Sequence, residues 1–462
     1  MLTLSKALRV SQPISIAFVG AGGKTTAMFQ LARQLGSAIL TTTTHLGPWE
    51  IDLADCHLQW ASGQPLPEIP QMGGVTLVTG PIDAVKNRCS GLDEHQTETL
   101  RRLAEHNNLP LLIEADGSRK LPFKAPGEHE PVIPDFVNMV VVVSGLSGFG
   151  QPLAEENVHR ANQFAALSGL KIGGKVSAAG LAKVLSHAEG GLKNIPAGAR
   201  RIALLNQADT VEMQAAAGSM DADLLKQYDS VLVASLQDEK IHAVFEPVTG
   251  VILAAGEASR YGKPKQLLDF HGEPFVRRVA KTALAAGLSP VVVVTGAYAE
   301  EVEAAVKGLD VQIIRNADWQ EGQASSIRAG LDPDPHPASP LAGHPAPNST
   351  KNRRIWGRER NVIFLLADQP QVTRHVLDAL KSRHAEGLFP IVAPLVADRR
   401  GNPVLFDRVT FDELCALQGD VGGRVLFRKY SIEYVPWHDE SLLFDVDDEQ
   451  AYRRLLAWGV ED

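Results

Sequence analysis

Two glycine-containing segments, each placed directly after an apolar run, contain the residue types that bind phosphate groups. In the first, Gly-Ala-Gly-Gly-Lys-Thr-Thr occupies positions 20–26 after the apolar run 14–19. In the second, Ala-Ala-Gly at 254–256 follows the apolar run 251–253, and three cationic residues follow within 260–265. Glycine lets the backbone turn sharply and approach a ligand closely, and backbone N–H groups with nearby cations bind triphosphates. Each segment therefore predicts a site for nucleotide phosphates.

The first segment has most of the pattern Gly-x-x-x-x-Gly-Lys-Thr, which defines a P-loop. In a P-loop, backbone N–H groups cradle the phosphates, the lysine ammonium reaches them, and the threonine hydroxyl binds Mg²⁺. Phe18 stands where the pattern has its first glycine. A glycine-rich turn without a ligand is the alternative interpretation. The residues that we expect to bind nucleotide here are Gly22, Gly23, Lys24, Thr25 and Thr26.

Acidic residues follow the apolar run 111–113 in the same half of the chain. Asp116 stands where a P-loop protein has the carboxylate that holds Mg²⁺, directly or through water, and Glu114 is the alternative ligand. After another strand-like run, the segment 206–209 (Asn-Gln-Ala-Asp) is similar to the base-reading pattern of GTPases with its lysine replaced. We therefore expect Mg²⁺ in this half, with ATP or GTP as the nucleotide.

Carboxylates also follow predicted strands in the second half. Mg²⁺ neutralises the charge that develops on a reacting phosphate, and carboxylates are its usual protein ligands. Asp368 follows the apolar run 362–366, at the end of a strand where open α/β sheets bind ligands. Asp447 lies in the acidic segment 445–448, in which Asp445 is the alternative. We expect Asp368 and Asp447 to bind metal, against the simpler roles of a turn residue and a helix cap.

Apolar runs that alternate with amphipathic segments place these residues at the ends of strands and helices. The alternation predicts an α/β protein with parallel sheets, and 462 residues exceed one ordinary core. A segment with Pro and Gly at 246–250 separates two series of runs, so we predict domains at 1–246 and 247–462. The segment 332–359 carries six prolines and few apolar residues, which predicts an irregular insert. Its basic cluster either contacts a phosphate-bearing ligand or is a solvated loop.

The composition argues against two classes of partner. Asp and Glu (54) exceed Lys and Arg (45), giving a formal net charge of −9, and this balance disfavours nucleic-acid binding. No apolar run approaches the length of a membrane span, and the first residues lack the apolar region of a signal peptide. The three cysteines show neither a disulfide nor a zinc spacing. We therefore expect a cytoplasmic protein without a membrane partner.

The second half resembles the nucleotidyltransferases that act on the molybdenum cofactor, in particular molybdenum cofactor cytidylyltransferase. The resemblance covers 248–458 and rests on the loop 253–265, on Asp-x-Pro at 368–370, and on 322–330, which is similar to the family's Gly-x-Ser-Ser-x-Arg-x-Gly with one additional residue. It implies a Rossmann-like nucleotidyltransferase domain, of nucleotide-diphospho-sugar transferase type, that transfers CMP from CTP to molybdopterin and releases pyrophosphate. It further implies catalytic roles for Arg260, Lys265 and Asp368, and nucleotide binding by Ala254, Ala255, Gly256, Asn316, Ser325, Ser326 and Arg328.

The first half resembles YqeC-type proteins, which are associated with the maturation of selenium-dependent molybdenum hydroxylases. The resemblance rests on 114–119 (Glu-Ala-Asp-Gly-Ser-Arg), 124–126 (Lys-Ala-Pro), 129–131 (His-Glu-Pro) and 159–160 (His-Arg), and it covers 14–236. It implies a P-loop-like nucleotide-binding domain that handles a molybdopterin-type cofactor. A molybdenum hydroxylase is then the expected acceptor protein.

Together these resemblances imply a fusion of a YqeC-like P-loop domain with a molybdenum cofactor cytidylyltransferase domain. A sugar-phosphate nucleotidyltransferase is the alternative within the enzyme class. A cofactor chaperone that binds nucleotide without turning it over is the alternative from another class. Pyrophosphate release from CTP with a molybdopterin acceptor distinguishes the three.

Overall fold

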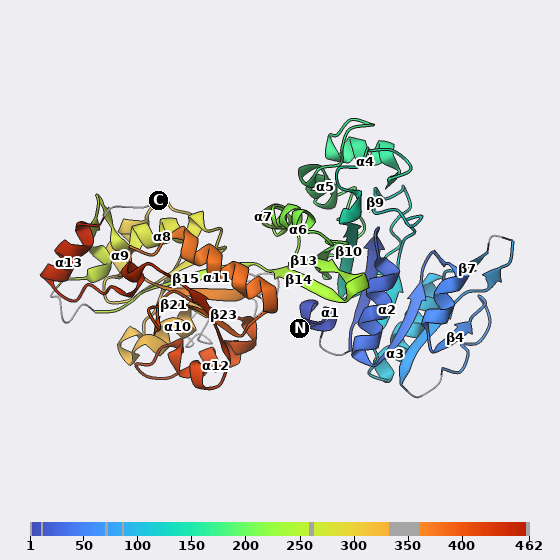
Figure 1. Cartoon of the computed structure of the whole chain (residues 1–462). Coiled ribbons are helices and arrows are strands. Elements are labelled where there is room, and N and C mark those ends of the chain that lie inside the picture. The colour runs from blue at the N-terminus through green and yellow to red at the C-terminus, as the bar shows by residue number, and fades with distance from the viewer. Residues whose placement is uncertain are drawn as a thin grey trace, which may run out of the picture. The chain divides into compact units, whose positions relative to one another are not determined.

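The computed structural model describes residues 2–10, 13–69, 73–85, 87–257, 263–331 and 360–458. The chain forms two compact units, Met1–Phe245 and Glu246–Asp462, and each has its own large sheet (Figure 1). The predicted insert 332–359 and the predicted catalytic residue Arg260 lie outside the described residues. In the described part of the chain, no helix has both the length and the apolarity that a bilayer crossing requires.

The first unit is built on a nine-stranded sheet with the strand order β14-β13-β12-β10-β1-β8-β2-β5-β4. All neighbouring strands are parallel except β13 and β14. The central strands are almost continuous apolar runs because helices cover both faces of a parallel sheet. The strands are β1 (Ser15–Gly20), β2 (Ser37–Thr42), β4 (Cys56–Gln59), β5 (Gly74–Thr79), β8 (Leu111–Glu114), β10 (Met139–Gly145), β12 (Arg200–Asn206), β13 (Ser230–Ser235) and β14 (Lys240–Phe245).

The helices of this unit connect and cover the strands. They are α1 (Leu4–Ala7), α2 (Lys24–Leu35), α3 (Glu94–His106), α4 (Ala161–Ser168), α5 (Ala178–Leu185), α6 (Val211–Gly218) and α7 (Asp221–Leu224). Helix α2 packs against β1, β2 and β8 and begins just after the loop that follows β1. The register pairs Phe18 with Glu114 and Gly145 with Asn206, so the carboxyl ends of β1, β8, β10 and β12 share one edge of the sheet.

Two small sheets add further residues to this unit. One contains β3 (His45–Leu46), β7 (Arg88–Ser90) and β6 (Ile82–Asp83), and the other pairs β9 (Phe123–Lys124) with β11 (Val158–His159). Each strand in them has only two or three residues. Such short strands carry no periodic signal that a sequence pattern would reveal.

The second unit has an eight-stranded sheet with the order β19-β18-β15-β20-β23-β21-β22, in which β24 also pairs with β21. Its strands are β15 (Val248–Ala254), β18 (Val291–Thr295), β19 (Gln312–Arg315), β20 (Asn361–Leu366), β21 (Ile391–Val396), β22 (Arg399–Arg400), β23 (Val404–Phe406) and β24 (Ile432–Pro436). The sequence predicted parallel sheets; this sheet is mixed, because β22 and β23 are antiparallel to their neighbours. Only Ala397 and Asp398, with φ of 46° and 60°, join β21 to β22, and such a two-residue turn forces an antiparallel pair.

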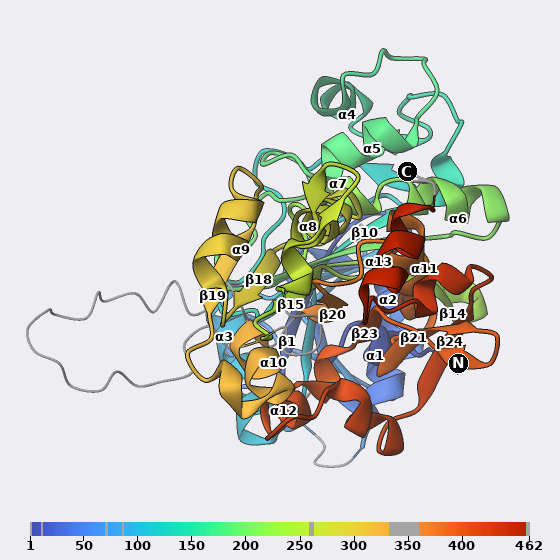
Figure 2. The ribbon, with the colours of Figure 1, turned by 90° about the vertical axis from the view of Figure 1, so that its left-hand side faces the viewer.

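Helices cover both faces of the second sheet. Along β15, Ile252 packs with helices α8 (Phe275–Ala285), α9 (Ala299–Val306) and α11 (Arg374–Gly387). The neighbouring residue Val251 packs with α10 (Gln323–Leu331) and α12 (Phe411–Cys415) on the other face. Figures 1 and 2 show the two groups of helices from different sides. Beside the sheet, α13 (Glu449–Leu456) packs on the hairpin of β16 (Asp269–Phe270) and β17 (Glu273–Pro274).

Candidate nucleotide-binding sites

The loop between β1 and α2 lies against the ends of β10 and β12. Gly22 and Gly23 have φ of 81° and 128°, and a Cβ atom on Gly22 would lie 2.4 Å from the backbone of Gly145. Asn206 Nδ2 donates to the carbonyl oxygen of Gly22 over 2.8 Å, and Asn206 Oδ1 accepts from the N–H of Leu236 over 3.0 Å. Because the backbone engages both polar atoms of its side chain, Asn206 is placed to support the loop rather than to read a base.

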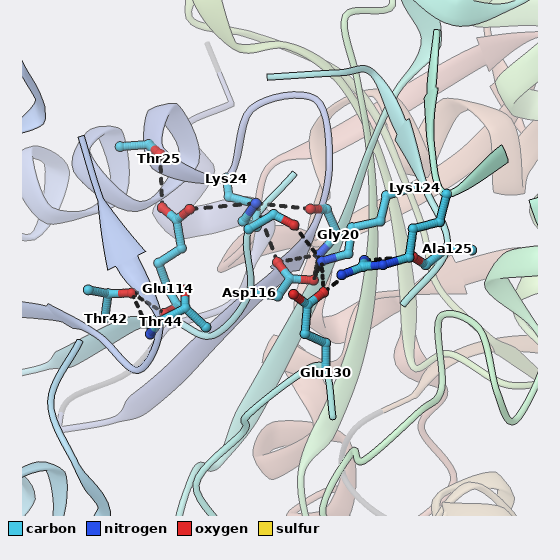
Figure 3. A network of polar contacts seen from close by, with 12 residues as sticks. Gly20, Lys24, Thr25, Thr42, Thr44, Glu114, Asp116, Lys124, Ala125 and Glu130 are labelled. Carbon is cyan, nitrogen blue, oxygen red and sulfur yellow. Dashed lines mark hydrogen bonds and ion pairs between the residues drawn. The ribbon is translucent and has the colours of Figure 1, made fainter. Parts of the chain in front are cut away.

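Lys24, the first residue of α2, is buried and points back toward the sheet. Its Nζ donates to the carbonyl oxygen of Gly20 over 2.9 Å and lies 3.3 Å from Asp116 Oδ1 and 3.5 Å from Glu114 Oε1 (Figure 3). Burial alone would lower the pKa of Lys24, but the charges of Asp116 and Glu114 raise it above its usual value. Lys24 is therefore a buried ammonium group at the start of the helix.

Thr25 brings a hydroxyl group to the carboxylate that ends β8. Its Oγ1 donates to Glu114 Oε2 over 2.8 Å and lies 3.2 Å from Glu50 Oε1. Burial raises the pKa of Glu114, and the charge of Lys24 offsets this only in part. A hydroxyl and a carboxylate that meet at the first turn of the helix are the protein groups with which P-loop proteins bind Mg²⁺.

Asp116 has a different environment. Its carboxylate accepts from the N–H of Gly20 over 2.9 Å and from Lys124 Nζ over 2.7 Å, and it also faces Lys24. Two ammonium groups and a backbone N–H thus engage the oxygens that a metal ion would need. Glu114, the alternative ligand, lines the pocket described below, whereas Asp116 does not. The geometry therefore favours Glu114 as the metal ligand.

The ion pairs continue beyond Asp116. Lys124 Nζ lies 2.8 Å from Glu130 Oε2, and Arg160 Nη1 lies 3.0 Å from the same oxygen. Burial alone would raise the pKa of Glu130, but hydrogen bonds from Arg160 and Lys124 lower it to about 2. Charges of alternating sign therefore run from Lys24 through Asp116, Lys124 and Glu130 to Arg160.

An open pocket of about 1160 Å³ adjoins this network. The residues 22–26, at the start of α2, form one wall of this pocket. The N-cap residue is Gly23, which has no side chain to cap the helix. The N–H groups in the first turn of a helix have no intrahelical acceptor and attract anions. All five residues that the sequence analysis assigned to the first nucleotide loop therefore face one cavity.

In the second unit, an open pocket of about 610 Å³ lies beside the carboxyl ends of β15 and β20. Three segments that are far apart in the sequence supply its walls: the loop after β15, the start of α10 and the loop after β20. Six predicted site residues line it, namely Ala254, Ala255, Gly256, Lys265, Ser326 and Asp368.

An acidic group surrounds Lys265 at this pocket. Lys265 Nζ donates to Asp447 Oδ1 over 2.9 Å, although 182 residues separate the two in the sequence. Burial raises the pKa of Asp368; Lys265 opposes this shift, and the charges of Asp445 and Asp447 add to it. Asp445 accepts from Gln369 Nε2 over 3.0 Å. The lysine and the three carboxylates therefore interact as one electrostatic group.

The other predicted nucleotide-binding residues of this unit have different surroundings. Asn316 is buried, and its Nδ2 donates to Ser325 Oγ over 2.8 Å and to Ser326 Oγ over 3.1 Å. Ser326 lines the pocket, whereas Asn316 and Ser325 do not. Arg328 does not line it either, because its guanidinium binds the carbonyl oxygen of Leu417 and the carboxylate of Glu321. Asn316 thus stabilises the start of α10 through its two serines, and Arg328 links this helix to Leu417 and Glu321.

Sequence reasoning did not include several residues that line the two pockets. In the first unit these are His45 and Arg88, on the small sheet, and Trp49, in the 3-10 helix Pro48–Leu53. In the second unit they include Trp319 and Gln320, in the turn before α10. These segments are short or irregular, so no hydrophobic period marks them.

Each pocket has a pair of carboxylates that a metal ion could use. Within the residues that the structure describes, no three His, Cys, Asp or Glu side chains are placed to hold a metal ion together. Asp368 and Asp447 both interact with Lys265, and Glu114 and Glu50 both contact Thr25. Because Mg²⁺ is usually held by one or two carboxylates together with substrate phosphates, these pairs fit that ion.

Comparisons with known proteins divide the chain into the same two parts. The YqeC protein family model matches residues 16–162, and the model of the MobA-like NTP transferase domain matches residues 250–434. The uncharacterized protein YqeC of Escherichia coli (strain K12) is 33% identical over 226 residues, which are 47% of this chain and 85% of that protein. Nicotine blue oxidoreductase of Paenarthrobacter nicotinovorans is 34% identical over 218 residues, which are 45% of this chain and 96% of that protein.

Among solved structures, Rv0371c from Mycobacterium tuberculosis H37Rv is similar, with 28% sequence identity and a TM-score of 0.37. The match covers 46% of this chain and 100% of that chain. The chain belongs to the YqeC protein family in its first half and to the family of MobA-like NTP transferase domains in its second half.

Proposed function

We propose that the second unit transfers CMP from CTP to a molybdopterin-type acceptor and releases pyrophosphate. The observation that carries this proposal is the meeting of Lys265, Asp368 and Asp447 beside a pocket that includes the loop 254–256. Nucleotidyl transfer requires a cation beside the triphosphate and carboxylates for a metal ion. The match to a MobA-like NTP transferase domain supports this class of reaction. The choice of CTP and of molybdopterin follows the resemblance of the loop and the paired serines.

In this reaction, a phosphate oxygen of the acceptor attacks the α-phosphorus of CTP, and the bond from that phosphorus to the β-phosphate oxygen breaks. Backbone N–H groups of 254–256 bind the triphosphate, and the Lys265 ammonium stabilises the charge that collects on pyrophosphate. For this, Lys265 exchanges its contact with Asp447 for phosphate oxygens. Asp368 and Asp447 would hold Mg²⁺, which neutralises phosphate charge when bound. No protein nucleophile is required, so orientation and electrostatics supply the catalysis.

For the first unit, we infer binding of ATP or GTP with Mg²⁺, in the service of a molybdenum cofactor that is delivered to a molybdenum hydroxylase. The contact of Thr25 with Glu114, at the end of a glycine loop that opens on a pocket, supports this inference. Lys24 would reach the phosphates by exchanging its carboxylate contacts for phosphate oxygens. Glu114, rather than Asp116, would hold the metal ion.

Pyrophosphate release by the full-length chain tests the proposal for the second unit. CTP, GTP and ATP are each supplied with Mg²⁺ and molybdopterin, and we expect release with CTP that depends on the acceptor. The Asp368→Asn variant should bind CTP and release no pyrophosphate. Release with sugar 1-phosphates but not with molybdopterin would assign a sugar-phosphate nucleotidyltransferase, and CTP binding without turnover would assign a cofactor chaperone.

An oxidoreductase is the second candidate for this unit. It is favoured by the 34% identity to nicotine blue oxidoreductase across 96% of that protein. Oxidation of NADH or NADPH in the presence of a redox dye, followed by absorbance, distinguishes the two reactions. Dye-dependent oxidation of the dinucleotide, without pyrophosphate release from any triphosphate, would replace the transferase assignment.

A further inference from the structure

The pocket of the first unit is larger than its nucleotide loop accounts for. Its volume of about 1160 Å³ is nearly twice the 610 Å³ of the pocket in the second unit, where we place a whole nucleoside triphosphate. The residues 22–26 form only one of its walls. Other parts of the lining come from the small sheet with β7 and from the loop 117–120. The pocket therefore has room for a second ligand beside a nucleotide.

Three cationic side chains on this other part of the lining are exposed and lack an acidic partner. Arg88 Nη1 lies 3.3 Å from His45 Nε2, and Lys120 Nζ lies 4.0 Å from the centre of the Trp49 ring. Across the ranges that the structure describes, neither these two residues nor Arg119 forms an ion pair with a carboxylate. Most other cations near the pocket, such as Lys24 and Arg160, are paired with carboxylates.

The two histidines of the pocket lie in positive surroundings. Burial lowers the pKa of His159 to about 4, with further lowering by Arg160, Lys124 and Arg119. Burial and the charge of Arg88 lower the pKa of His45 as well. Both shifts favour the neutral imidazole, and the unpaired charge of this wall resides on Arg88, Arg119 and Lys120.

The backbone of the loop 117–120 holds two of these cations in an uncommon conformation. Arg119 and Lys120 have φ of 51° and 61°, in the left-handed region that is unfavourable for a residue with a Cβ atom. Such conformations persist where the surrounding structure enforces them, and they cluster at ligand-binding sites. Here two consecutive left-handed residues bring two cationic side chains to the same pocket.

We propose that Arg88, Arg119 and Lys120 form a subsite for the phosphate group of a second, small-molecule ligand. The subsite lies in the pocket where we place the nucleotide of the first unit, so the proposal rests on that assignment. A phosphomonoester carries up to two negative charges and three strong acceptors, which match a cluster of unpaired guanidinium and ammonium groups. The ring of Trp49, over which Lys120 lies, is 51% exposed and offers apolar surface to the rest of the ligand. The first unit would then bind a nucleotide and a phosphorylated small molecule together.

Titration calorimetry with inorganic phosphate tests this subsite. The full-length chain is first saturated with Mg²⁺, CTP and the non-hydrolysable nucleotide AMPPNP, so that phosphate competes with neither nucleotide. We expect saturable phosphate binding that weakens at least tenfold in the double variant Arg119→Ala/Lys120→Ala. The affinity for AMPPNP should stay within threefold of the unsubstituted chain.

The matched control is Lys171→Ala/Lys183→Ala, which removes two exposed cations of the same unit that do not line the pocket. Its phosphate affinity should equal that of the unsubstituted chain. Equal phosphate affinities in the two double variants, or no saturable phosphate binding at all, would overturn the proposal. Lys24→Ala separates the two assignments, because it should remove AMPPNP binding alone. If neither AMPPNP nor the GTP analogue GMPPNP binds the unsubstituted chain, the nucleotide assignment fails, while phosphate binding that depends on Arg119 and Lys120 still supports the subsite.

Discussion

Replacing Asp116 by asparagine removes the carboxylate that lies between two buried lysines. Lys24 Nζ and Lys124 Nζ lie 3.3 Å and 2.7 Å from its oxygens, and all three side chains are at most 3% exposed. At an effective dielectric constant of about 20, these distances correspond to about 5 and about 6 kcal/mol of attraction, from which several kcal/mol of desolvation must be subtracted. Because Lys24 keeps Glu114 and Lys124 keeps Glu130, we expect a net loss of about 3 kcal/mol, the lower end for a broken buried pair.

Hydrogen exchange followed by mass spectrometry of the full-length chain measures this loss within the first unit alone. A loss of about 3 kcal/mol lowers the protection of β1 and β10 about 100-fold, since each power of ten corresponds to about 1.4 kcal/mol. The protection of peptides from the second unit should be unchanged. The control Asp223→Asn breaks the exposed pair with Lys226, so it should change protection little. A change below threefold in β1 and β10 for Asp116→Asn would refute this account of the network.

A second variant separates support of the loop from metal binding. Glu114→Gln should keep most of the stability, because burial already favours an uncharged side chain at this position. It should nevertheless weaken nucleotide binding that depends on Mg²⁺, measured by titration with and without the ion. The opposite result would identify Asp116 as the metal ligand: Mg²⁺-dependent nucleotide binding would be normal in Glu114→Gln and lost in a stable Asp116→Asn variant.

Further predictions concern protons and side-chain roles. Asp368 must be ionised to bind metal, and burial raises its pKa. The rate of pyrophosphate release should therefore fall with decreasing pH while ordinary aspartates are still ionised. A pH–rate profile that falls only in the usual aspartate range would contradict this. The pKa of Glu130 is about 2 in the folded chain and 4.5 without the fold, so its ionised form stabilises the fold above pH 4.5. This stabilisation is lost as the pH falls toward 2. In acid unfolding, the stability of Glu130→Gln should therefore depend less on pH between 4.5 and 2. Asn206→Ala should weaken ATP and GTP binding alike, by about 1–3 kcal/mol, and a loss confined to GTP would indicate base reading. Arg328→Ala should lower the melting temperature and change the KM for CTP less than threefold, whereas a tenfold rise in KM at unchanged stability would place its guanidinium on the nucleotide.

The central strands and the two glycine loops could be predicted from the sequence because their signals are local. β1, β10 and β15 are apolar runs, and the residues that we expect to bind phosphate stand directly after β1 and β15. In a parallel sheet, the carboxyl ends of neighbouring strands meet at one edge, so Glu114 and Asp116 could be expected near Lys24 from the pattern alone. The MobA-like resemblance likewise placed Asp368 and Lys265 at one site.

The parts that the sequence did not reveal depend on contacts between distant segments. Nothing in the pattern around Asp116 shows that Lys124 folds back onto it, so its role as a partner of lysines had no local signal. The pair of Lys265 and Asp447 bridges most of the second unit and follows from the course of the chain rather than from spacing. Arg88 and His45 reach the first pocket through strands of two or three residues, too short for any period to be read.

The contacts of the loop 20–23 have a consequence for the rate and entropy of nucleotide binding. Asp116 holds the N–H of Gly20, Asn206 holds the carbonyl oxygen of Gly22, and Gly145 limits the space beside it. Fixing a backbone residue costs about 1–2 kcal/mol of conformational entropy, and folding of the unit already includes this cost for the loop. A nucleotide that binds this loop, as we propose, would meet a preorganised surface, and its association should be a single step without a slow phase for loop ordering.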